Sequence, residues 1–172
     1  AMNEMSLSFL SVSANESFAR AAVSAFASQL DPTIDQLADL KTAVSEAVTN
    51  AIVHGYRETL GTVYITAKLY ETGKITVKIR DKGVGIEDIE KAMEPLFTTG
   101  GEERAGLGFA VMQSFCDKVS VRSTPGKGTA VTLQKNLLRR GRSHDCPSGV
   151  HRRQHRSGTR LRQPFPESGN RL

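Results

Sequence analysis

Residues 63–79 contain two stretches in which apolar and polar side chains alternate strictly. The apolar positions are Val63, Ile65, Ala67 and Leu69 in the first stretch and Ile75, Val77 and Ile79 in the second. Alternation with a period of two is typical of a β-strand that buries one face. Because Glu71-Thr72-Gly73 supplies a turn between them, the two stretches are predicted to form an antiparallel hairpin. Any fold for this chain must therefore supply a second layer that covers one face of a sheet.

That second layer is predicted to be helical. Apolar residues at helical spacing predict helices over about 15–29, 33–55 and 108–118, and a short helix before Pro95. Alternation of apolar and polar residues predicts further strands over 5–12 and on both sides of a turn at 124–128. The order strand, helix, helix, hairpin, helix, loop, helix, hairpin does not fit a doubly wound parallel sheet. We predict an α/β (α+β) two-layer sandwich, in which a mixed, largely antiparallel sheet is covered on one face by helices.

The first helix is predicted to begin at Asn15, because asparagine is a favourable N-cap residue. Its predicted apolar face consists of Phe18, Ala22, Phe26 and Leu30. Arg20 falls off that face. Asp31-Pro32-Thr33 interrupts the chain and caps the next helix, which His54-Gly55 closes.

The second helix carries two polar side chains beside its apolar stripe. Glu46 and Asn50 are four residues apart, so they lie on one face, one turn from each other. A polar pair next to a core-facing stripe is costly unless it has a partner, and this one could hold a metal and a reacting hydroxyl. Taken alone, such a pair is more often a solvated helix flank.

Two glycine motifs follow. Asp81-x-Gly83-x-Gly85 stands at the end of a predicted strand, where a carboxylate can accept from an exocyclic amine and the glycines let the backbone approach a flat ring. Gly106-Leu107-Gly108 opens a helix, where backbone N–H groups can hold phosphate. Singly, the first is ordinary turn chemistry and the second a flexible hinge, and neither is a Walker loop. Their order on this layout of strands and helices is what favours a nucleotide site.

Composition limits the cellular compartments in which the protein is expected. No stretch of 18 apolar residues occurs, so no membrane span is expected, and the first residues lack the basic and apolar regions of a secretory signal. Two cysteines, Cys116 and Cys146, give no disulfide framework. We therefore expect a cytoplasmic protein.

The net charge of +5 belongs to the C-terminal end of the chain. Residues 1–138 hold 14 Lys and Arg against 16 Asp and Glu, whereas residues 139–172 hold nine Arg against two acidic residues. We predict one domain over 1–138 and a disordered, Arg-rich tail over 139–172. A zinc site in the tail is disfavoured, because the spacing of its histidines and Cys146 matches no common site. Affinity of the tail for nucleic acid would be blind to sequence, so no specific nucleic-acid binding is expected.

The three blocks resemble the N, G1 and G2 boxes of the Bergerat-fold (GHKL) ATPases. Within that superfamily the chain is most similar to the small serine kinases that act as anti-sigma factors, above all those of the anti-sigma-F kind in endospore-forming bacteria. The segments that carry this likeness are NESFAR at 15–20, SEAVTNA at 45–51, HGY at 54–56 and EPLFTT at 94–99. The likeness covers about residues 2–137 and leaves out the tail.

The resemblance implies a role for each block. Glu46 is the implied general base, Arg104 neutralises charge on the γ-phosphoryl group, and Asn50 holds Mg²⁺. Asp81 is implied to bind the adenine amine of ATP or ADP. The other implied nucleotide-binding positions are His54, Gly55, Gly83, Gly85, Ile86, Thr98, Thr99, Gly106, Leu107, Gly108 and Thr129. Residues 99–106 correspond to a lid that closes over the nucleotide.

The resemblance also implies partners. Such kinases hold a sigma factor inactive, here a sigma-F-like factor, and phosphorylate a serine on the anti-anti-sigma antagonist; they are commonly homodimers. Arg20, which lies off the apolar face of the first helix, is expected to face a partner protein, and the alternative is that it is simply solvated. Two alternatives stay open: a histidine-kinase-like ATPase fragment, and a nucleotide-dependent sigma-binding module without kinase activity. No histidine precedes Glu46, which disfavours the first, and Glu46 itself disfavours the second, because a pure binder needs no base.

Overall fold

One sheet of five strands, in the order β1-β2-β3-β5-β4, organises the protein. The structure, a computed structural model, describes residues 1–94 and 108–137. The strands are β1 (Asn3–Leu10), β2 (Thr62–Leu69), β3 (Lys74–Arg80), β4 (Lys118–Thr124) and β5 (Gly128–Asn136). The hairpin predicted over 63–79 is present, with Ile65 opposite Ile79 in β2 and β3. The two-layer fold is confirmed, and every described pairing in the sheet is antiparallel rather than mixed.

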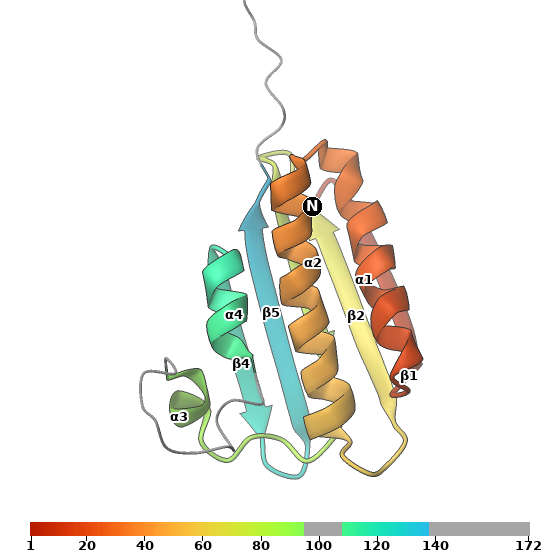
Figure 1. The fold of residues 1–172 in the computed structure, drawn as a ribbon, viewed down its shortest axis with the longest axis vertical. Coiled ribbons are helices and arrows are strands. Elements are labelled where there is room, and N and C mark those ends of the chain that lie inside the picture. Colours follow the sequence, from red (N-terminus) through yellow and green to blue (C-terminus); the bar gives the residue numbers. More distant parts are fainter. Residues whose placement is uncertain (95–107, 138–172) are drawn as a thin grey trace, which may run out of the picture. The chain divides into compact units, whose positions relative to one another are not determined.

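The helices form the second layer. They are α1 (Ala14–Ala27) with a 3₁₀ turn η1 (Ser28–Leu30), α2 (Ile34–Thr49) with a π-helical turn η2 (Asn50–Gly55), α3 (Ile89–Met93) and α4 (Phe109–Phe115). Figure 1 shows α1 and α2 side by side across one face of the sheet. In the described parts of the chain, no helix is both long and apolar enough to cross a membrane.

Several predicted features lie outside the described residues. They are the lid with Thr98, Thr99, Arg104, Gly106 and Leu107, the domain boundary after residue 138, and the Arg-rich tail with its histidines and Cys146. These stay predictions.

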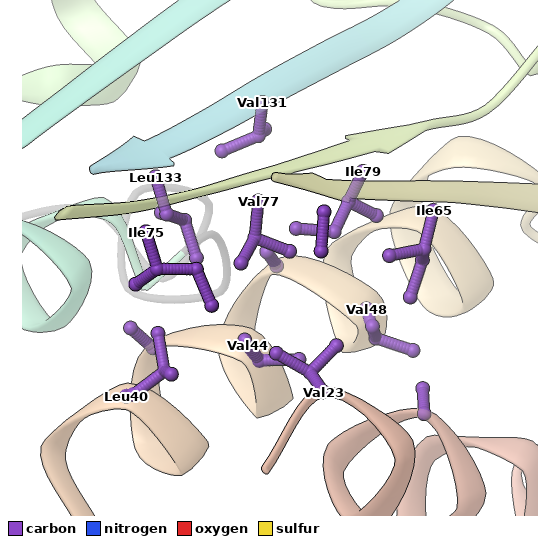
Figure 2. Packing of buried hydrophobic residues seen from close by; sticks show 14 of the residues in the cluster. Val23, Leu40, Val44, Val48, Ile65, Ile75, Val77, Ile79, Val131 and Leu133 are labelled. Carbon is purple, nitrogen blue, oxygen red and sulfur yellow. The ribbon is translucent and has the colours of Figure 1, made fainter. Parts of the chain in front are cut away.

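The core lies between the two layers. Every second residue of β2 and β3 is buried, and Figure 2 shows Val23, Leu40, Val44 and Val48 of the helices facing Ile65, Ile75, Val77, Ile79, Val131 and Leu133 of the sheet. Burial of one such aliphatic side chain contributes roughly 1.5–3 kcal/mol. The alternation seen in the sequence is therefore the pattern by which the sheet buries one face against the helices.

The first helix differs from its prediction in two ways. Its N-cap is Ser13 rather than Asn15, whose side-chain amide instead donates to the Leu10 carbonyl oxygen at 2.9 Å. Phe18, predicted to face the core, is 54% exposed and contacts Phe9 edge-on with ring centroids 6.3 Å apart. The buried face runs instead through Ala19, Val23, Phe26 and Leu30. These positions share one helical face, and Phe18 precedes that stripe by about 100° of rotation.

The second helix begins as predicted, at Asp31-Pro32-Thr33. Thr33 and Gln36 form a capping box: Thr33 Oγ1 accepts from the Gln36 N–H at 3.2 Å, and Gln36 Oε1 accepts from the Thr33 N–H at 3.1 Å. This reciprocal pair satisfies two backbone donors that a helix N-terminus otherwise leaves open. It also sets where α2 starts, and hence where the residues of its last turns lie.

We expect Thr33→Ala to lower the free energy of unfolding by about 1 kcal/mol, because it removes the N-cap acceptor of α2. Thr42→Ala is the matched control. Thr42 is exposed on the same helix and its hydroxyl donates only to the Ala38 carbonyl oxygen of the preceding turn. It should change stability by less than about 0.5 kcal/mol. Urea unfolding of both variants measures the difference, and equal losses would show that the capping box contributes nothing special.

Candidate functional site

A cavity of about 490 Å³ opens where α2 ends, β3 ends and β5 begins. In Figure 1 the end of α2 and the start of β5 lie close together at the lower edge of the sheet. Its wall consists of Ala47, Asn50, Ala51, His54, Gly55, Arg57, Ile79, Asp81, Val84, Gly85, Ile86, Glu87, Phe109, Thr129 and Val131. Its polar members are Asn50, His54, Arg57, Asp81, Glu87 and Thr129, and the rest of the wall is apolar or glycine. A concave site of this volume that combines apolar surface with placed polar groups is typical of small-molecule binding.

Seven predicted nucleotide-binding residues share this wall: Asn50, His54, Gly55, Asp81, Gly85, Ile86 and Thr129. They come from three parts of the chain that are far apart in sequence. The first three belong to the π-helical turn after α2, the next three to the loop after β3, and Thr129 to the start of β5. The predicted blocks therefore converge on one cavity.

Asp81 is the buried carboxylate of this cavity, with 6% of its surface exposed. Its side-chain Oδ1 accepts from the Gly83 N–H at 2.9 Å, and its backbone N–H donates to the Thr129 carbonyl oxygen at 2.9 Å. Burial raises the pKa of the carboxyl above its ordinary value, while the backbone N–H donors of Gly83 and Thr129 lower it in part. The folded protein thus holds this proton more tightly than the unfolded chain, so this group lowers stability as pH rises through the raised pKa. An N–H donor on a ligand would stabilise the ionised form.

Glu46 lies on α2 one helical turn before Asn50, on the same face of the helix. It does not line the cavity wall, but its carboxylate packs against Gly108, the N-cap residue of α4. Gly108 has φ +62°, and a Cβ placed on it would lie 2.2 Å from Oε2 of Glu46. A glycine is therefore required twice here, for the left-handed backbone and for the space that the carboxylate occupies.

Asn50 fits the part of a single oxygen ligand for a hard cation. It is 8% exposed and its side-chain carbonyl oxygen Oδ1 is fully buried beside the cavity, one helical turn after Glu46. Among residues 1–94 and 108–137, no group of three or more His, Cys, Asp or Glu could hold a metal. Mg²⁺ commonly takes only one or two protein oxygens and keeps waters and ligand phosphates for the rest. A single buried amide oxygen would fit such a shared site.

Four predicted positions fall outside the cavity wall: Glu46 and Gly108, which contact each other, and Gly83 and Arg20. Gly83 lies behind the wall, where its N–H holds the Asp81 carboxylate. Arg20 is on α1 and not in the cavity wall, with its Nε 3.9 Å from Oε1 of Glu16. The same Glu16 oxygen accepts a hydrogen bond from the hydroxyl of Ser45, the neighbour of Glu46.

Two charged residues of the wall, Arg57 and Glu87, were not predicted from the sequence. Arg57 has φ +45°, which is uncommon for a residue with a side chain. Neither belongs to a periodic stretch or to one of the glycine motifs, so no signal in the sequence marked them. Phe109 and Ile79 were also missed as wall residues, although Phe109 directly follows Gly108 and Ile79 stands two residues before Asp81, and both could have been found from that proximity.

Comparison with known proteins identifies the family of this chain. The family of the histidine kinase-like ATPase domain matches residues 12–135. An anti-sigma F factor of Thermoanaerobacter sp. (strain X514) is 63% identical over 137 residues, which are 78% of this chain and 94% of that protein. The anti-sigma F factor of Bacillus subtilis (strain 168) is 54% identical over 137 residues, 78% of this chain and 93% of its own length. The chain therefore belongs to the histidine kinase-like ATPases and, within them, to the anti-sigma F factor family.

Solved structures share the fold at low sequence identity. The RsbU and RsbW domains of Rv1364c from Mycobacterium tuberculosis superpose with a TM-score of 0.58 at 21% identity, over 80% of this chain and 32% of that one. The blue-light activated histidine kinase EL346 of Erythrobacter litoralis gives a TM-score of 0.50 at 19% identity, over 68% of this chain and 40% of that one. The predicted family and fold class are confirmed.

We expect Gly108→Ala to move the Glu46 carboxylate, because the new Cβ takes the place of its Oε2. Gly126→Ala is the matched control: Gly126 has φ +77°, and a Cβ on it meets nothing within 4 Å. Both variants should lose about 1 kcal/mol of stability from the left-handed backbone. Only Gly108→Ala should shift the side-chain carboxyl ¹³C resonance of Glu46 in NMR spectra. An unchanged resonance would show that the contact between residues 46 and 108 is absent in solution.

Proposed function

We propose that this protein is an anti-sigma factor that binds ATP or ADP with Mg²⁺, inhibits a sigma-F-like factor, and acts as an ATP-dependent protein serine kinase on the anti-anti-sigma antagonist. The observation that carries the kinase proposal is the position of Glu46. Its carboxylate lies against Gly108 at the start of α4, next to a cavity of nucleotide size that has Asp81 in its wall. Membership of the anti-sigma F factor family supports the choice of partners.

Each of the site residues that the structure describes has a proposed role in nucleotide binding. The ionised carboxylate of Asp81 accepts only, so it selects a ligand that offers an N–H group, as the exocyclic amine of adenine does. Gly85 and Thr129 lie in the same wall, and Ile79, Val131 and Phe109 supply apolar surface for a base. Asn50 would hold Mg²⁺, which neutralises phosphate charge when bound.

Glu46 would take the proton from the serine hydroxyl that attacks the γ-phosphoryl group. Phosphoryl transfer needs alignment and charge neutralisation more than covalent help. The contact of Glu46 with Gly108 would provide this alignment, because it holds the base at the N-terminal end of α4 where backbone N–H groups can bind phosphate. Arg104 and the lid residues Thr98, Thr99, Gly106 and Leu107 complete this proposal as predictions from sequence.

The partner surface is proposed to include Arg20. A hollow between α1 and α2 is lined by Phe18, Arg20, Lys41, Ser45 and Glu46 among others, and it runs from the exposed Phe18 towards the base. Contact between a partner and Arg20 would disturb the ion pair of Arg20 with Glu16, which also holds Ser45 next to Glu46. A homodimer in the cytoplasm is proposed for the active form.

Glu46→Gln tests the kinase proposal. The substitution keeps size and hydrogen bonding but removes the basic carboxylate, and it leaves Asn50 and Asp81 in place. Mg·ATP should bind about as before, and transfer to serine on the antagonist should fall by roughly 10²–10⁴, the usual contribution of a positioned general base. Calorimetry measures binding, and mass spectrometry of phosphoserine measures transfer.

Two other outcomes discriminate among the alternatives. Transfer at the normal rate would show that Glu46 is not the base. If wild-type protein binds the sigma factor and ATP but never phosphorylates an antagonist, the module is a nucleotide-dependent binder without kinase activity. A loss of ATP binding in Glu46→Gln would place Glu46 in the nucleotide or metal shell instead.

Arg20→Glu tests the partner surface. Reversal of the charge should weaken binding of the sigma-F-like factor by about tenfold or more and leave ATP affinity unchanged, because Arg20 is not part of the cavity wall. Lys127→Glu, at the turn between β4 and β5, makes the same charge change on another surface and should leave sigma binding unchanged. Surface plasmon resonance with the sigma factor and calorimetry with ATP measure the two affinities. Equal weakening by both variants would point to a general charge effect and remove the assignment of Arg20.

A further inference from the structure

Tyr56 lies directly behind the loop that carries Asp81. It is 7% exposed and is not part of the cavity wall. Its hydroxyl accepts a hydrogen bond from the Lys82 N–H at 2.9 Å and donates one to the Thr62 carbonyl oxygen at 2.5 Å. One side chain therefore connects the backbone next to Asp81 with the first residue of β2.

The ring that carries this hydroxyl has a fixed position. Gly61 packs flat against it, since a Cβ on Gly61 would lie 2.1–2.4 Å from three ring atoms. The backbone of Tyr56 is held as well, because its N–H donates to Ala51 and its carbonyl oxygen accepts from both the N–H and the hydroxyl of Thr59. The hydroxyl thus holds the Lys82 amide against a rigid support.

The preceding residue, Gly55, holds the other side of the same loop. Its carbonyl oxygen accepts from the Val84 N–H at 2.9 Å, and Gly83 packs so closely on it that a Cβ there would lie 1.9 Å away. A Cβ on Gly55 would lie 2.8–3.0 Å from the carboxylate atoms of Asp81. Asp81 is therefore confined on one side by Gly55, while its own chain is fixed one residue later by Tyr56.

We propose that Tyr56 is a positioning residue for base recognition: through the Lys82 amide its hydroxyl fixes the carboxylate of Asp81 and so sets the preference for a purine with a 6-amino group over one with a 6-oxo group. This inference rests on the proposed function of Asp81 as the acceptor for the adenine amine. Tyr56 itself touches no ligand, and it acts only by holding the acceptor in place. Small errors in the place of a hydrogen-bonding group lower discrimination between ligands more than they lower overall binding.

The test compares the affinities of wild-type protein and Tyr56→Phe for Mg·ATP and Mg·ITP by calorimetry. The ring and its packing on Gly61 remain in this variant, and only the hydroxyl is lost. ATP affinity should fall about three- to tenfold, which corresponds to the loss of one hydrogen bond of ordinary strength. ITP affinity should change little, because inosine lacks the amine that Asp81 accepts from. The ratio of the two affinities is the readout, since a merely structural role would not move it.

Two control variants separate positioning from general damage. Tyr64→Phe removes a hydroxyl from a ring that contacts the side chains of Arg80 and Lys82 of the same region, and Ile75→Val loosens the core at the far end of β3. Both should keep the wild-type ratio of ATP to ITP affinity. An unchanged ratio in Tyr56→Phe, or an equal loss for both nucleotides, overturns the inference.

Asp81→Asn distinguishes a failure of the inference about Tyr56 from a failure of the proposed function of Asp81. If the wild type prefers ATP and Asp81→Asn abolishes the preference, the adenine assignment is correct and Tyr56→Phe decides the inference alone. If Asp81→Asn keeps the preference, the adenine assignment fails, and the inference about Tyr56 is overturned with it.

Discussion

The packing of α2 on the antiparallel sheet sets the place of every residue in the site. Leu40, Val44 and Val48 lie on one stripe of the helix and face Ile75, Val77 and Ile79 of β3 (Figure 2). A helix with one buried stripe has only one rotation that buries it. That rotation puts Glu46 beside the stripe, against Gly108, and puts Asn50 in the cavity wall. The hydrophobic contact between α2 and β3 thus sets the positions of Glu46 and Asn50, although neither side chain is part of that contact.

Burial of the Asp81 carboxylate costs free energy of hydration. A carboxylate with 6% exposure loses most of its hydration, and its raised pKa records that loss. The donors that reduce the cost are backbone N–H groups of the same loop and of β5, and the packing of Gly55 and Tyr56 fixes where that loop runs. A buried acceptor held this way is rigid before any ligand arrives, and such preorganisation is what selective binding needs.

Two surfaces of α2 serve different parts of the proposed activity. One borders the nucleotide cavity, and the other borders the hollow beside α1 that contains Arg20 and Phe18. Ser45 and Glu46 are neighbours in sequence, and Ser45 is tied to α1 through Glu16. Binding of a partner at Arg20 would therefore be linked to the proposed base through Glu16 and Ser45. This arrangement suits a protein that must hold one partner and phosphorylate another.

The sequence by itself determined the elements and the motifs. Period-two and helical spacing are local properties, so the hairpin of β2 and β3, the start of α2 at Thr33 and the order of the three blocks could be read directly, and the family resemblance followed from those blocks. Tertiary structure alone decided which side of α1 is buried, leaving Phe18 exposed, and that Arg57 and Glu87 reach the cavity wall. It also decided that Gly108 meets Glu46 and that Tyr56 supports Asp81. These contacts join residues 26 to 62 positions apart in the chain. No local pattern encodes them, because they exist only once the sheet and the helices have packed together.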